Sequence, residues 1–272
     1  MDSALKSRIT TGVALAGLVL LGTLLLPTKF FAVFSLIALV SIGGWEWSRL
    51  VGCTDLRQGL FVATLIGASL LAYLFEDLRW VFIVTGVLWW AAILVLLGVY
   101  EKGTWLYKDN KWILRLSALL VIVPAWVALI TLHSHYPALV IYLIFLVAAA
   151  DSGAYFSGKK FGKTKLAPEL SPGKTREGMM GGFVVAIIWA VISAIFFDLP
   201  ASDWFYFIFL SAIVALLSVS GDLFESLIKR EAGQKDSGNI LPGHGGILDR
   251  VDGLLAALPL FTLGIFWGSV LV

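Results

Sequence analysis

The sequence predicts an all-α, polytopic integral membrane protein with about nine transmembrane helices. Its 272 residues are 59% hydrophobic and only 14% charged, and the mean hydropathy is +0.92. A soluble domain carries about 25% charged residues. The apolar residues come in long blocks separated by short polar segments, so the solvent that the blocks face is a lipid bilayer.

Nine apolar blocks are long enough, or nearly long enough, to cross a bilayer as helices, which takes about 20 residues each. The first and third blocks are short, so eight or ten helices stay open as alternatives. The first block follows Lys6 and Arg8, as in a secretory signal, but no small-residue cleavage site follows it, and we interpret it as a retained helix. The blocks cover residues 11–26, 30–50, 59–75, 80–100, 114–132, 138–157, 180–197, 204–221 and 253–272.

The positions of Lys and Arg orient these helices, because cytoplasmic loops of membrane proteins carry an excess of both. With nine helices and a cytoplasmic N-terminus, the outer loops hold only Lys29 and Arg79 of the 20 Lys and Arg residues. The inner segments hold the others: Lys6, Arg8, Arg49, Arg57, Lys102, Lys108, Lys111, Arg115, Lys159, Lys160, Lys163, Lys165, Lys174, Arg176, Lys229, Arg230, Lys235 and Arg250. A wrong helix count would have mixed cations between the two sides, so the pattern supports nine helices.

Two inner segments, about 158–179 and 223–248, are much longer than the outer connections. We therefore divide the chain into about five N-terminal helices in 1–137 and about four catalytic helices in 138–272. The active site is expected at the cytoplasmic ends of the C-terminal helices.

Two pairs of glycines, Gly178 with Gly182 and Gly264 with Gly268, have the four-residue spacing that lets helix backbones approach closely. We expect them to pack helices within the chain, and a homodimer seam is the alternative.

Carboxylates lie at the inner ends of several predicted helices, where they are costly unless they face protein, water or an ion. Asp222 and Glu225 share one face of a helix end, and Asp249 and Asp252 repeat their spacing at the start of the last helix. Oxygen ligands in such an arrangement suit a hard cation such as Mg²⁺. We predict metal coordination by Asp222 and Asp249, with Asp252, Asp151 and Glu225 as further candidates.

Two carboxylates also have ordinary explanations. Glu46, within Trp45-Glu46-Trp47, lies close to Arg49, so an ion pair at the interface explains it as well as a role in a site. Asp252 would suit the positive end of the last helix dipole.

Cations accompany the carboxylates and complete a phosphate-binding pattern. Lys229, Arg230, Lys235 and Arg250 flank the two aspartates and would neutralise the oxygens of a polyphosphate. The turn Gly-His-Gly-Gly at 243–246 offers backbone N–H groups with little side chain in the way, which is suitable for cradling phosphate.

The other long inner segment repeats the theme with Lys174 and Arg176. Gly173-Lys174-Thr175 looks like the end of a P-loop, but a Walker A loop needs glycine where Pro168 stands, and no strand is expected before it. We interpret this segment as a different phosphate-binding loop that closes over the site.

The stretch from Ser226 to Asp252 resembles the signature of the phosphatidate cytidylyltransferases, the CDP-diacylglycerol synthases. Residues 171–178 and 151–155 are similar to two further segments of that family, and the specific resemblance covers about 148–253. The signature reads Ser226-x-x-Lys229-Arg230-x4-Lys235-Asp236-x-Gly238-x2-Leu241-Pro242-x-His244-Gly245-Gly246-x-x-Asp249-Arg250-x-Asp252.

The resemblance implies an enzyme that joins CTP and phosphatidic acid to give CDP-diacylglycerol and pyrophosphate with Mg²⁺, to which a second metal or a monovalent cation is an open addition. It also implies an integral protein of the bacterial cell inner membrane, with its site facing the cytoplasm and no nucleic-acid partner. The implied catalytic residues are Asp222, Asp249, Lys229, Arg230, Lys235, Asp236, His244 and Arg250. The implied substrate-binding residues are Ser171, Lys174, Thr175, Arg176, Ser226, Gly245 and Gly246.

Other functions fit less well. A transporter also buries carboxylates, but it has no use for a glycine-rich loop with four cations on one face. A CDP-alcohol phosphotransferase needs further aspartates after Asp252-Gly253, and the chain has none there. A lipid kinase of related fold that uses CTP or ATP stays open, whereas a purely structural protein would leave the loop unexplained.

Overall fold

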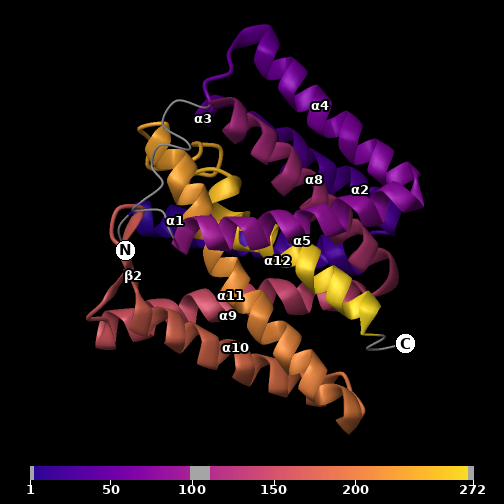
Figure 1. Ribbon diagram of the computed structural model, residues 1–272, viewed down its shortest axis with the longest axis vertical. Coiled ribbons are helices and arrows are strands. Elements are labelled where there is room, and N and C mark those ends of the chain that lie inside the picture. Colours follow the sequence, from indigo (N-terminus) through magenta and orange to yellow (C-terminus); the bar gives the residue numbers. More distant parts are fainter. Residues whose placement is uncertain (1–2, 99–110, 269–272) are drawn as a thin grey trace.

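The computed structural model describes residues 3–98 and 111–268, and these are almost entirely helical, which confirms the all-α class (Figure 1). The elements are α1 (Ser3–Leu25), α2 (Thr28–Ser35), the π-helix η1 (Leu36–Ile42), α3 (Gly43–Leu50), α4 (Asp55–Leu74), α5 (Glu76–Gly98), α8 (Lys111–His135), α9 (Pro137–Phe161), β1 (Lys165–Ala167), β2 (Ser171–Thr175), α10 (Arg176–Phe196), α11 (Ala201–Glu231) and α12 (Leu248–Trp267).

Eight helices within the described residues are long and apolar enough to cross a membrane, with α2, η1 and α3 joined into one span, Thr28–Leu50. They correspond to eight of the nine predicted blocks and make this an integral membrane protein. The remaining block, residues 11–26, falls on α1, whose described apolar part, Thr10–Leu25, is shorter, so this span stays a prediction. Lys102 and Lys108, counted among the inner cations, lie outside the described residues.

The two long inner segments are more ordered than the sequence predicts. Helix α9 continues to Phe161 and α11 to Glu231, although loops were expected from about 158 and 223. Hydrophobicity marks only the apolar part of a helix, whereas backbone hydrogen bonding continues through polar residues. The segment expected as a plain loop contains an antiparallel hairpin in which β1 pairs with β2, Lys165 opposite Thr175.

Helices α8 and α11 lie at the centre and are buried along most of their length. One aromatic cluster ties the N-terminal helices to α11 directly beside the predicted site. Phe224 lies 6.3 Å from Trp47 of α3, 6.2 Å from Trp89 and 5.9 Å from Trp90 of α5, measured between ring centroids. The residue that follows Phe224 is Glu225, so this cluster lies next to the carboxylates of α11.

Helices α9 and α10 lie side by side along one edge of the molecule (Figure 1). A Cβ at Gly178 would lie 2.8 Å from the carbonyl oxygen of Ala154, and one at Gly182 would lie 2.5 Å from that of Ala150. At the second glycine pair, a Cβ on Gly264 would lie 2.5 Å from Leu210 of α11. The expectation that both pairs pack helices within the chain is confirmed.

Candidate active site

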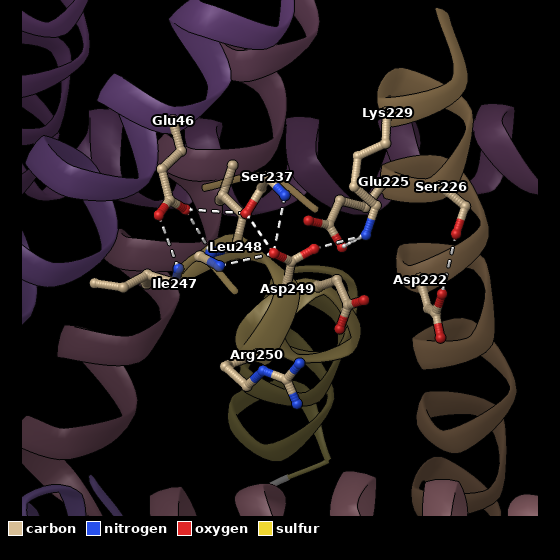
Figure 2. Close-up of polar contacts among 12 residues, drawn as sticks. Glu46, Asp222, Glu225, Ser226, Lys229, Ser237, Ile247, Leu248, Asp249 and Arg250 are labelled. Atoms are coloured by element: carbon tan, nitrogen blue, oxygen red, sulfur yellow. Dashed lines mark hydrogen bonds and ion pairs between the residues drawn. The ribbon is translucent and has the colours of Figure 1, made fainter. Parts of the chain in front are cut away.

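The candidate site lies where the end of α11, the start of α12 and α3 meet (Figure 2). The β1–β2 hairpin reaches it through Lys174, which pairs with Asp222. Lys229 is its central cation. The Nζ of Lys229 donates to Oδ1 of Asp249 at 2.7 Å and to Oε2 of Glu225 at 3.2 Å. Glu225 and Lys229 are four residues apart on α11, so they share a helix face, and Asp249 reaches them from the first turn of α12.

The second oxygen of Asp249 is held by the loop before α12. Oδ2 accepts from the backbone N–H of Gly246 at 2.8 Å, from the N–H of Ser237 at 2.9 Å and from the Ser237 hydroxyl at 2.9 Å. Both oxygens of Asp249 are therefore bound, one by an ammonium group and the other by the loop. The carboxylate has one fixed orientation.

Asp222 belongs to a different ion pair. Its Oδ2 lies 2.6 Å from the Nζ of Lys174 on β2, and its Oδ1 accepts from the Ser226 hydroxyl at 3.3 Å. Asp151 of α9 and Asp252 of α12 interact electrostatically with Asp222 and with the same lysine. The hairpin thus brings one cation to three carboxylates from three helices.

Asp222 and Asp249, which the sequence predicts as a metal pair, are each paired with a lysine. Within the described residues, no three Asp, Glu, His or Cys side chains are gathered closely enough to hold a metal ion. A magnesium ion in phosphoryl transfer needs only one or two carboxylates, since waters and substrate phosphates supply the other ligands. The metal assignment stays a prediction.

The donor set nevertheless fits a hard cation in its chemistry. Carboxyl groups outnumber the ammonium groups of Lys174 and Lys229 around the two ion pairs. Oε1 of Glu225 is buried, and the carboxyl group of Asp252 lies against that of Glu225. A cation among these oxygens would offset the excess negative charge.

The glycine turn before α12 has a structural explanation. Gly243 and Gly245 have φ angles of +73° and +79°, in the left-handed region that favours glycine, and the N–H of Leu241 bonds the Gly245 carbonyl at 2.9 Å. The N–H of Gly246 is donated to Asp249. In this structure the turn shapes the loop around Asp249, and its use as a phosphate cradle stays a prediction.

The remaining signature cations lie at the rim. Arg250 is exposed and donates its Nε–H to the His244 carbonyl at 2.9 Å, and Arg230 donates its own to the Leu170 carbonyl at a long 3.4 Å. Lys235 is exposed, as is its neighbour Asp236. These side chains stay accessible to a ligand.

In the other segment, the structure separates cap residues from ligand candidates. Thr175 is the N-cap of α10, where its Oγ1 accepts from the N–H of Gly178 at 3.1 Å. Ser171, on the same strand, is half-buried, and Arg176 at the start of α10 is exposed. Lys174 alone among these residues forms an ion pair with the carboxylates of the site.

Sequence reasoning left Glu46 undecided and missed Ser237. Within the described residues, no ion pair joins Glu46 to Arg49. The Glu46 carboxylate, 1% exposed, instead accepts from the N–H groups of Ile247 and Leu248 at 3.0 and 2.9 Å and from the Ser237 hydroxyl at 3.2 Å. The one sequence signal was a carboxylate within an apolar helix, which already calls for buried partners.

Comparison with known proteins identifies the family of this chain. The model of the cytidylyltransferase family matches residues 6–267. The chain is 38% identical to a phosphatidate cytidylyltransferase of Pseudomonas aeruginosa over 97% of its length and 98% of the relative, and 36% identical to one of Haemophilus influenzae over 97% and 99%. It is 46% identical to one of Bacillus subtilis over 47% of this chain and 48% of the relative.

Both the family model and the first two relatives span nearly the whole chain, so the matched region covers α3 as well as α11 and α12. The chain belongs to the cytidylyltransferase family.

Proposed function

We propose that this chain is a phosphatidate cytidylyltransferase, which converts CTP and phosphatidic acid to CDP-diacylglycerol and pyrophosphate. The observation that carries the proposal is the cluster at the ends of α11 and α12. There, the carboxylates of Asp222 and Asp249 are each held by a lysine, Lys174 and Lys229, in a family match that spans the chain. Relatives that are similar over nearly their whole length have this name.

The position of the cluster suits these two substrates. A site at the ends of apolar helices lets a lipid keep its acyl chains in the bilayer while its phosphate reaches the charged groups. The exposed cations at the rim, Lys235, Arg250 and Arg176, suit a nucleotide triphosphate that arrives from water.

The reaction is an in-line displacement at the α-phosphorus of CTP. A phosphate oxygen of phosphatidic acid forms the new P–O bond, the bond to the β-phosphate oxygen breaks, and pyrophosphate leaves with its electron pair. The attacking phosphate is already largely ionised near neutral pH, so no strong general base is needed. His244 would assist by hydrogen bonding.

The cations of the site neutralise the charge on the reacting phosphates. Lys229 and Lys174 are held by carboxylates, and each retains N–H donors that can turn to a phosphate oxygen. Arg230 and Arg250 would bind non-bridging oxygens with paired hydrogen bonds, and Arg176 would hold one substrate from the hairpin side. Ser226, beside Asp222, would donate to the same phosphates.

We propose Mg²⁺ as the cofactor, held by Asp222 and Asp249, with Asp252, Asp151 and Glu225 as further ligands for it or for a second cation. When bound, the ion would act as a Lewis acid and stabilise the negative charge that develops on the phosphates. The ion-pair lysines would then share those carboxylates with it. The excess of carboxyl groups over ammonium groups in the cluster supports this assignment.

We place the protein in a bacterial inner membrane with this site facing the cytoplasm. The bacterial sources of the relatives and the gathering of Lys and Arg on one side of the helices support this orientation.

The test is pyrophosphate release by the purified protein in detergent with Mg²⁺, CTP and phosphatidic acid, omitting each in turn. We expect release only when both CTP and phosphatidic acid are present. Folded protein that releases no pyrophosphate with both substrates would contradict the proposal. Transfer from CTP or ATP to a lipid alcohol would favour the lipid kinase.

A further inference from the structure

We infer that Glu46 is a positioning residue of the active site: from the N-terminal half of the chain, it caps α12 and, through Ser237, fixes the orientation of Asp249. The inference rests on the proposed function for its kinetic consequences. Its structural part is independent of which reaction the site performs.

Glu46 caps the start of α12. The leading N–H groups of a helix have no partner within the helix and are usually bound by a capping side chain. The N-cap position of α12 is Ile247, whose side chain accepts no hydrogen bond, and no side-chain cap is formed there. Glu46 takes this role from 201 positions away, with one carboxylate oxygen on the N–H of Ile247 and the other on that of Leu248 (Figure 2).

The buried carboxylate of Glu46 is stabilised by hydrogen-bond donors. Glu46 is 1% exposed, and within the described residues no Lys or Arg forms an ion pair with it. A buried carboxylate is costly unless several donors satisfy it. The two N–H groups, the Ser237 hydroxyl and the positive end of the α12 dipole together supply that stabilisation. Glu46 and the start of α12 therefore depend on each other.

Ser237 links Glu46 to Asp249. Its hydroxyl lies 3.2 Å from Oε2 of Glu46 and 2.9 Å from Oδ2 of Asp249. Its backbone N–H also donates to Asp249, at 2.9 Å. A shift of Glu46 would thus move the same residue that holds Asp249 against Lys229.

Two glycines of the signature pack directly on this carboxylate. A Cβ at Gly238 would lie 2.6 Å from Oε1 of Glu46, and a Cβ at Gly246 would lie 2.6 Å from Oε2. These positions leave no room for a side chain while Glu46 is in place. The carboxylate therefore shapes the segment from Ser237 to Asp249, which carries His244, Gly245, Gly246 and Asp249 of the predicted site.

The substitution that tests the inference is Glu46→Gln, which keeps the size of the side chain. An amide presents one oxygen and one NH₂ group, so one of the two α12 N–H groups would face a donor in place of an acceptor. Glu76→Gln is the control, because Glu76 is an exposed carboxylate in the first turn of α5.

Amide hydrogen exchange of the folded variants is the structural measurement. We expect Glu46→Gln to speed exchange at least tenfold in peptides from 237–250, with no change in α10 peptides, and Glu76→Gln to leave both unchanged. Unchanged exchange in 237–250 would overturn the inference. Faster exchange throughout the protein would also overturn it, because Glu46 would then stabilise only the fold.

The kinetic measurement separates positioning from substrate binding. We expect Glu46→Gln to lower kcat at least tenfold and to change the KM for CTP less than threefold, because all the cationic side chains at the rim are retained. Ser237→Ala should lower kcat less, and the double variant should be no slower than Glu46→Gln alone. If the two losses in kcat multiply in the double variant, the link through Ser237 is contradicted. A folded wild-type protein without turnover would refute the proposed function, and hydrogen exchange would still decide the role of Glu46.

Discussion

Lys229 and Asp249 lie on different helices, 20 positions apart, yet the Lys229 Nζ is 2.7 Å from Oδ1 of the aspartate. The side chains of both are largely buried, at 13% and 6% exposure. A buried ion pair contributes little net stability but is strongly destabilising when one partner is removed, because the other charge is left unpaired. This pair therefore fixes the geometry between α11 and α12 at the site.

Replacing either aspartate by asparagine should abolish turnover. We expect Asp222→Asn and Asp249→Asn each to lower the rate of pyrophosphate release by at least about 100-fold, since each removes a carboxylate that we propose as a ligand of Mg²⁺. The detergent-solubilised variants should still elute as folded protein on size-exclusion chromatography. Retention of most of the activity by either variant would rule out its role in the site.

Magnesium should bind to the protein through Asp222 independently of turnover. We expect Mg²⁺ to raise the thermal unfolding temperature of the wild-type protein in detergent, because an ion that binds only the folded state stabilises it. EDTA should reverse the shift and stop pyrophosphate release. An equal shift in Asp222→Asn would show that the ion binds elsewhere.

The cap of α10 should contribute to stability. Thr175 accepts from the N–H of Gly178, so Thr175→Ala should lower the free energy of unfolding by about 1 kcal/mol, whereas Thr175→Ser should retain most of it. Thr64→Ala is the control, because Thr64 lies in the middle of α4 and its hydroxyl bonds only the Leu60 carbonyl. Unfolding in mixed detergent micelles measures the difference, and equal effects at both threonines would contradict the cap.

Close contact between α9 and α10 should make Gly182 intolerant of any side chain. Gly182→Ala would place a Cβ 2.5 Å from a backbone carbonyl oxygen, which cannot yield like a side chain, so we expect a loss of about 1–3 kcal/mol. Gly67→Ala on α4 meets no atom within 4 Å and should be neutral or stabilising by up to about 1 kcal/mol. Thermal unfolding of the two variants compares them, and a stable Gly182→Ala would refute the tight packing.

The helical architecture could be predicted from the sequence, because a segment that crosses a bilayer must satisfy its backbone hydrogen bonds internally. Long apolar blocks had to be helices, and eight of them match helices of the structure that can cross a membrane. What hydrophobicity could not locate was where a helix ends in polar surroundings, so α9 and α11 extend past the predicted edges at about 157 and 221. The β1–β2 hairpin was not predicted, because its strands are too short and too polar to show a hydrophobic pattern.

The site was predictable where its residues are close in sequence and hidden where they are not. Asp222, Glu225 and Lys229 share one helix face, which the spacing alone indicates. The contact of Glu46 with the start of α12 joins residues 201 and 202 positions apart, and the pairing of Asp222 with Lys174 depends on how the hairpin folds back. No local pattern could have revealed either one.

The fate of each phosphorus atom of CTP is the most direct test of the central claim. CTP labelled at the α-phosphate and CTP labelled at the γ-phosphate should be incubated separately with the wild-type protein, Mg²⁺ and phosphatidic acid. We predict that the α-label appears in the lipid fraction and the γ-label in pyrophosphate, because attack occurs at the α-phosphorus. Appearance of the γ-label in the lipid would contradict the account, since it would mean that this site transfers the terminal phosphate as a kinase does.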